Sequence, residues 1–210
     1  EDDAHVQVLR AEKLAYVLRL DILADWIGKK SSRRAENLYR MLPAQFQQTV
    51  DLLKDYRLFP LNLLGRLVVN DINRSIVQAF PEDVRYECAS TMGEIAQAAY
   101  QYEDAVTYWK EAEEVAVAKK DVRKQIASLL GQNAGLIPTR LRETVDVLQT
   151  GLDLVSQAPE FEVELLYEMG YVHRRLEDIE TAVKYYEQAL EKAMETQNED
   201  WLPTILNDLG

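Results

Sequence analysis

The chain has 210 residues, of which 47% are apolar, so it can bury a substantial hydrophobic core and is not a disordered tail. The 36 acidic and 24 basic side chains give a formal net charge of −12, which opposes binding to polyanionic nucleic acid. No run approaches the roughly 20 apolar residues of a membrane-spanning helix, and the single cysteine, Cys88, favours a reducing compartment, with the cytoplasm first.

Helices are predicted throughout the chain. Glycine and proline are scarce, at 8 and 6 residues, and apolar side chains recur at helical spacing, which predicts an all-α fold. The first helix should run from about Val6 to Ile27 and end at Gly28. We expect residues 1–80, with 12 basic and 10 acidic side chains, to form an N-terminal helical module that is either a cap or a set of degenerate repeats. The basic segment 28–34 within it is interpreted as a loop, with a docking point for an acidic surface or a phosphate as the alternative.

From residue 81 onward the sequence repeats itself. A cluster of small and apolar residues recurs around four glycines, Gly93, Gly131, Gly170 and Gly210, which are separated by 38, 39 and 40 residues. A second cluster follows each of the first three glycines, as Ala105, Trp109 and Ala112, then Thr144, Leu148 and Gly151, then Ala182, Tyr186 and Ala189. This spacing predicts pairs of antiparallel helices, because a glycine on the first helix lets the second approach closely.

These clusters divide residues 81–210 into units of about 82–120, 121–160 and 161–200, followed by a partial unit at 201–210. This part carries 12 basic and 26 acidic side chains, a net of −14, so the negative charge is concentrated here. The chain begins with Glu1 and stops inside the fourth unit, so we expect it to be part of a longer protein.

The combination of a glycine, a small residue, an aromatic residue and another small residue at these spacings resembles the tetratricopeptide repeat. The resemblance covers about residues 82–210 and is clearest around Gly93 and Gly170. Around Gly131 the chain departs from the pattern, and the period exceeds the usual length of about 34 residues. The resemblance implies a right-handed superhelix of antiparallel helix pairs, an α-solenoid, that serves as a scaffold for protein binding.

In tetratricopeptide-like arrays the first helix of each unit lines a concave groove, which the resemblance implies as the binding surface. The residues expected to face this groove are Glu87, Ser90, Glu94, Gln97, Ser128, Gln132, Tyr167, Tyr171, Arg174 and Asn207. Tyr167 and Tyr171 beside Arg174 are the leading candidates, because aromatic residues and arginine are enriched at binding hot spots. The alternative for the tyrosines is packing between first helices.

The best-known peptide-binding members of the family grip a carboxylate with lysine, asparagine and arginine residues. Here Glu94 and Tyr171 stand where asparagines would be needed, and Ser90 where a lysine would be. An acidic groove instead favours a partner protein or peptide with basic residues.

Catalysis is not expected. The chain has only two histidines, His5 and His173, and neither stands in a pattern of nucleophile, base and orienting partner. His173 occupies a place held by a small residue in two other copies and is interpreted as a packing residue. Acidic runs such as Glu111, Glu113 and Glu114 lack metal-ligand spacing, and no phosphate or dinucleotide motif is present, so we expect no metal and no cofactor.

The sequence therefore favours an adaptor that holds a partner peptide or helix in its groove. One alternative is a sensor or regulatory arm of a larger signalling ATPase, protease or transcription regulator. Another is a scaffold for self-assembly into a homo-oligomer.

Overall fold

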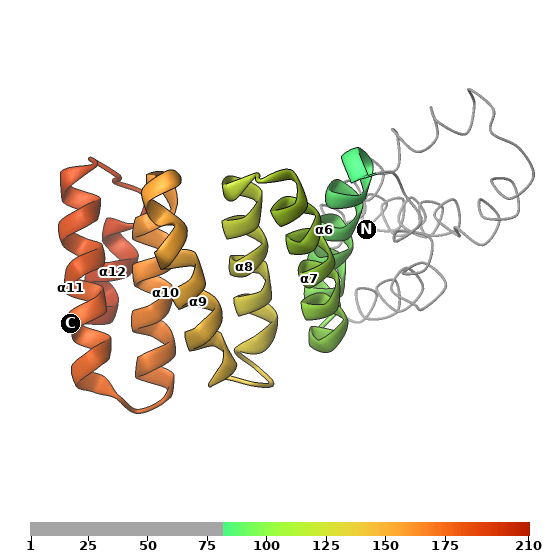
Figure 1. Cartoon of the computed structure of the whole chain (residues 1–210). Helices are drawn as coiled ribbons and strands as arrows, with labels where there is room; N and C mark the ends of the chain where they lie inside the picture. Colours follow the sequence, from blue (N-terminus) through green and yellow to red (C-terminus); the bar gives the residue numbers. More distant parts are fainter. Residues whose placement is uncertain (1–81) are drawn as a thin grey trace, which may run out of the picture. The chain divides into compact units, whose positions relative to one another are not determined.

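The computed structural model describes residues 82–210 (Figure 1). The predicted module of residues 1–80 and its basic segment 28–34 lie outside the described residues. Across 82–210 every regular element is a helix, which confirms the predicted all-α class. None of the helices in this part is long and apolar enough to cross a membrane.

The chain divides into two compact units, Glu1–Val115 and Ala116–Gly210. In the first unit, α6 (Glu82–Ala98) precedes α7 (Tyr102–Lys119), whose last residues belong to the second unit. The second unit contains α8 (Val122–Leu136), α9 (Glu143–Leu154), the 3₁₀ turns η1 (Val155–Gln157) and η2 (Pro159–Phe161), α10 (Glu162–Arg175), α11 (Ile179–Glu195) and α12 (Leu202–Leu209). The predicted boundary at residue 80 stays a prediction.

Helices α10 and α11 form an antiparallel pair (Figure 1), and its closest contact is at a glycine. A β-carbon built on Gly170 would lie 2.6 Å from Cδ1 of Tyr186, inside van der Waals distance. The same relationship recurs between α6 and α7, where a β-carbon on Gly93 would lie 2.8 Å from Nε1 of Trp109. The prediction that these two glycines let the second helix approach closely is confirmed, and the structure adds that a large side chain of the second helix lies against each glycine.

Small residues also govern the contact between successive helix pairs in the second unit. A β-carbon on Gly151 of α9 would lie 2.7 Å from Cδ2 of Leu165 on α10. Gly151 stands where the repeat pattern usually has alanine, so the departure noted in the sequence has a structural use. The absent side chain leaves room for Leu165, which is fully buried.

Helix α10 contributes to two hydrophobic clusters. Leu165, Met169 and Val172 pack in a cluster that includes residues of α8 and α9, whereas Val163 and Leu166 pack in one that includes residues of α11 and α12. Each fully buried side chain of this size contributes about 1.5–3 kcal/mol relative to exposure. Helix α10 is therefore fixed from both sides, and any site built on it is rigid.

Four of the helices end in the same way. Tyr100, Lys120, Glu177 and Gln197 follow α6, α7, α10 and α11 with positive φ angles of 59°, 55°, 64° and 54°. After α10, the N–H of Asp178 bonds the carbonyl of His173, and that of Glu177 bonds the carbonyl of Arg174. This pair of bonds satisfies the last carbonyls of the helix. Asp178 then caps α11 by accepting a hydrogen bond from the N–H of Thr181 at 3.3 Å. The chain can therefore reverse its direction between α10 and α11 within a few residues.

Candidate functional site

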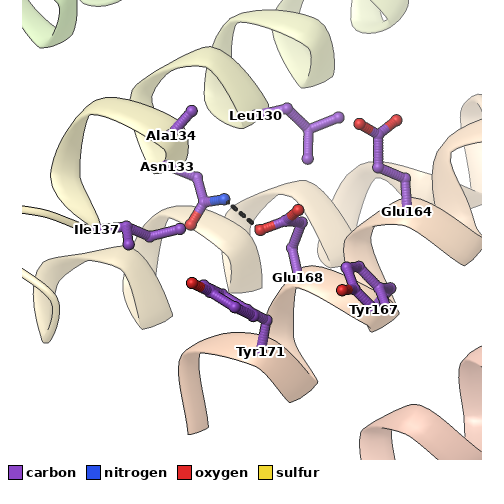
Figure 2. Close-up of a pocket in the computed structure, with 8 residues that line it drawn as sticks. All are labelled: Leu130, Asn133, Ala134, Ile137, Glu164, Tyr167, Glu168 and Tyr171. Carbon is purple, nitrogen blue, oxygen red and sulfur yellow. Dashed lines mark hydrogen bonds between the residues drawn. The ribbon is translucent and has the colours of Figure 1, made fainter. Parts of the chain in front are cut away.

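A cavity of about 320 Å³ lies between α8 and α10 (Figure 2). It is lined by Leu130, Asn133 and Ala134 from α8, by Ile137 at the C-terminal cap of α8, and by Glu164, Tyr167, Glu168 and Tyr171 from α10. Each set follows the spacing i, i+3, i+4, i+7, which places its members on one face of their helix. The cavity is thus formed by two facing helical stripes. The α8 stripe is mainly aliphatic and the α10 stripe carries carboxylates and phenols.

A hydrogen bond joins the two stripes. The amide nitrogen of Asn133 donates to Oε2 of Glu168 at 2.9 Å, and Figure 2 shows the two side chains pointing toward each other. Asn133 is only 2% exposed, and its Oδ1 has no hydrogen-bond partner among the described residues. A buried acceptor of this kind costs free energy unless a donor reaches it.

Both carboxyl groups of the cavity have raised pKa values. Burial raises the pKa of Glu168, the hydrogen bond from Asn133 opposes that shift, and the nearby charge of Glu164 adds to it. Burial also raises the pKa of Glu164. Within the described residues neither carboxylate has a salt bridge. A cation brought by a ligand would therefore stabilise the ionised form of each carboxyl group.

Tyr167 has a structural role besides lining the cavity. Its hydroxyl donates to Oδ2 of Asp208 on α12 at 2.8 Å, and its ring lies 5.5 Å from that of Tyr186 and 5.1 Å from that of Trp201. Burial, followed by the bond to Asp208, raises the pKa of the Tyr167 hydroxyl. Tyr167 therefore packs between first helices, which is the alternative that the sequence left open.

Tyr171 and Arg174 do lie together, as the sequence predicted. The guanidinium of Arg174 lies 5.4 Å from the Tyr171 ring centroid, and Arg175 donates to the Tyr171 hydroxyl at 3.1 Å. Arg174 also lies 3.7 Å from Oδ1 of Asp208, within ion-pair distance. Only the tyrosine lines the cavity, because the arginine is directed toward α12.

Two of the residues expected to face the groove do not do so. Ser128 and Gln132 are 0% and 2% exposed, so the expectation that they are exposed was wrong. Helix α8 is buried around most of its circumference, unlike a surface helix with one apolar stripe. Ser128 is accommodated there because its hydroxyl donates to the carbonyl of Lys124 at 2.8 Å, within the helix.

The remaining predicted residues lie on other helices. On α6, Glu87 is exposed, whereas Ser90, Glu94 and Gln97 are partly buried, and Asn207 is exposed on α12. None of these five lines the cavity between α8 and α10. Their contact with a partner stays a prediction.

Sequence reasoning missed Asn133, Glu164 and Glu168. On α8 the predicted face was that of Ser128 and Gln132, and a shift of one residue turns the face by about 100°. A search for polar residues at i−3 and i+1 from Tyr167 would have found both glutamates. Asn133 carried no such signal, since a buried asparagine looks like any polar helix residue.

Among residues 82–210, His173 and Cys88 are the other groups with potential reactivity, and each has a structural explanation. Nδ1 of His173 lies 3.2 Å from Oδ2 of Asp178, and its ring stacks on Tyr185, so it helps to hold the turn between α10 and α11. Burial raises the pKa of the Cys88 thiol, with the charge of Glu87 adding to the shift, so the reactive thiolate is disfavoured. Over residues 82–210 no group of three or more histidine, cysteine or acidic side chains is placed to hold a metal ion.

Comparison with known proteins finds a family match for the helix pair α10 and α11. Residues 163–195, which span α10 and α11, match the family model described as Tetratricopeptide repeat. The chain contains a tetratricopeptide repeat. A solved Rap protein, crystallised in complex with competence and sporulation factor, has a similar fold, with a TM-score of 0.55 and 14% sequence identity. That similarity covers 100% of this chain and 70% of the Rap chain. No curated protein matches the sequence.

The matched tetratricopeptide repeat contains both Gly170 and Tyr186, the residues that form the closest contact of the α10–α11 pair. Its first helix supplies four of the residues that line the cavity. Tetratricopeptide repeats are typically interaction modules without catalysis, which supports a general role in protein binding. The cavity lies between the first helix of this repeat and the preceding first helix, α8.

Proposed function

We propose that the chain is a protein-interaction scaffold that holds a peptide segment of a partner along α8 and α10, with basic residues of that segment at the cavity. The observation that carries this proposal is the cavity itself, which combines an aliphatic wall, two tyrosines and two carboxylates. Aromatic side chains with few rotatable bonds supply contact area at low entropic cost, and the carboxylates select for positive charge.

Two further observations support the proposal. Helix α10 is packed on both faces, so its wall of the cavity is preorganised and few protein side chains have to become ordered on binding. The Rap protein of similar fold was crystallised with a factor bound, which favours the same mode of action here. Because Cys88 is the only cysteine of the chain, the proposal includes the cytoplasm as the place of action.

The test is to select peptides from a displayed random library on the 210-residue chain and to measure their affinity by calorimetry. Ala134 lines the cavity, so Ala134→Trp should fill it and weaken binding at least about tenfold. Ala118→Trp is the matched control, because Ala118 is an exposed alanine on α7. Equal affinity of the wild type and Ala134→Trp, with both variants folded by circular dichroism, would refute binding at this cavity.

A regulatory arm of a larger protein is the second candidate. It is favoured by the likeness to a Rap protein in complex with a factor named for competence and sporulation. The selected peptide separates the two functions when it is added to the full-length parent protein. A change in the parent's activity supports the regulatory arm, whereas capture of the peptide without such a change supports a simple scaffold.

A further inference from the structure

The cavity between α8 and α10 presents hydrogen-bond acceptors without matching donors. Asn133 is 2% exposed and uses its amide nitrogen on Glu168, so its Oδ1 is left as a buried acceptor without a partner among the described residues. The assignment of oxygen and nitrogen in this amide is fixed by the partner, since a carboxylate accepts the donated hydrogen. The unpartnered atom is therefore an oxygen.

The two carboxylates extend this set of acceptors. Glu164 and Glu168 lie one helical turn apart on α10 and line the same cavity (Figure 2). Three basic side chains of α10 and α11 have other partners, since Arg174 is paired to Asp208, Lys192 lies near Glu162 and Glu195, and Arg175 donates to the hydroxyl of Tyr171, which itself lines the cavity. Within the described residues no cation pairs with Glu164 or Glu168. A ligand that complements this wall has to bring both positive charge and several donors.

The shape and the remaining walls discriminate between cations. A metal ion such as Ca²⁺ takes six to eight oxygen ligands, whereas two carboxylates and an amide supply five at most, and over residues 82–210 no group of three or more acidic, histidine or cysteine side chains is placed to hold a metal. An ammonium is a compact point charge, whereas a guanidinium is planar, carries five N–H donors in a fixed fork and packs against aromatic rings. The aliphatic side chains of Leu130, Ala134 and Ile137 suit the methylene stem of an arginine, and the Tyr171 ring already has the guanidinium of Arg174 5.4 Å from its centroid.

We propose that this cavity is the subsite for an arginine side chain of the bound partner, with the guanidinium shared by Glu164, Glu168 and Oδ1 of Asn133. The inference rests on the proposed function, since the arginine belongs to the peptide held along α8 and α10. The inference names arginine as the residue that is recognised at one position of that peptide. The bond between Asn133 and Glu168 keeps the acceptors in place before the ligand arrives, so the subsite is formed in advance.

The test uses a peptide selected on the chain that contains one or more basic residues. Synthetic versions carry arginine, lysine or citrulline at each basic position in turn, since citrulline keeps the shape of arginine and removes its charge. At one position the arginine peptide should bind about tenfold or more tightly than both analogues, because charge-assisted, bidentate hydrogen bonds are lost. Equal affinity of all three peptides at every position would overturn the arginine subsite, and preference for lysine would do the same.

Variants of the protein locate the effect. Glu164→Gln and Glu168→Gln keep the side-chain shape and should each reduce the preference for arginine over citrulline by about tenfold, because each removes one charged acceptor. Glu180→Gln on α11, where the side chain is 83% exposed, is the matched control and should leave the preference unchanged. Glu164→Gln keeps the test valid if Glu168→Gln fails to fold, because Glu164 makes no hydrogen bond to Asn133. An unchanged preference in a folded Glu164→Gln variant overturns the assignment.

Two further experiments distinguish failure of the proposed function from failure of the arginine subsite. Selected peptides that bind Ala134→Trp as well as the wild type refute the proposed function itself, whereas peptides that lose affinity for Ala134→Trp but bind equally with citrulline refute only the arginine subsite. Arginine amide, titrated alone, should bind far more weakly than the peptide. If it bound as tightly, the cavity would be a site for a small guanidinium compound and the peptide subsite would be wrong.

Discussion

The Tyr186 ring lies directly against the backbone of Gly170, where an added β-carbon would be 2.6 Å from Cδ1 of the ring. Gly170→Ala should therefore destabilise the protein by roughly 1–2 kcal/mol. Overpacking costs about 1–3 kcal/mol, and the gain in helix propensity offsets up to about 1 kcal/mol of it. Urea unfolding measures the change. In a Tyr186→Leu background the same substitution should be neutral or stabilising, and an equal loss in both backgrounds would disprove the contact.

Trp109 is the counterpart of Tyr186 in the α6–α7 pair and is 7% exposed. Trp109→Ala should lower the free energy of unfolding by about 3–5 kcal/mol, because the indole is removed from a packed interior. Chemical denaturation followed by far-ultraviolet circular dichroism gives the value. A loss below about 1 kcal/mol is typical of surface positions and would mean that the residue does not fill the core.

Glu177 has a φ of 64°, a conformation that glycine adopts without strain. Glu177→Gly should stabilise the protein by about 0.5–1 kcal/mol. The relief of left-handed strain, about 1–2 kcal/mol, exceeds the added entropy of the unfolded chain, about 0.4–1 kcal/mol. Thermal unfolding should show a higher midpoint. Glu177→Ala serves as control and should bring no such gain, because alanine keeps the β-carbon.

The buried carboxyls predict how stability depends on pH. Glu164 and Glu168 have pKa values raised above the ordinary 4.5, so over that interval the folded state binds more protons than the unfolded state. The stabilisation that these two groups contribute is greatest at pH values below the ordinary pKa of glutamate. It is lost as the pH rises through their raised pKa values in the folded protein. The double variant Glu164→Gln/Glu168→Gln should flatten this fall in urea titrations at successive pH values. If the free energy of unfolding of the double variant falls with pH as steeply as that of the wild type, Glu164 and Glu168 do not cause the fall. Glu180→Gln is the control for the loss of a charge.

The secondary structure and the close packing of adjacent helices could be predicted from the sequence alone. Helical spacing and scarce glycine and proline predict the all-α class, and Gly93 and Gly170 at a regular interval predict close helix pairs. These inferences succeed because a period of 3.6 residues and the absence of a β-carbon act within one helix or between adjacent helices. The structure supplied the identity of the side chains at these contacts, which are Trp109 against Gly93 and Tyr186 against Gly170.

Tertiary structure decided which faces of these helices are free. The sequence assigned Ser128 and Gln132 to an open groove, yet α8 is enclosed by its neighbours and buries both, while the next residue, Asn133, lines the cavity. A single helix cannot indicate how many neighbours cover it, because its circumference carries several faces that differ by one residue. The pairing of Asn133 with Glu168 joins positions 35 residues apart and exists only once α8 and α10 are packed, as does the acceptor-lined cavity between them.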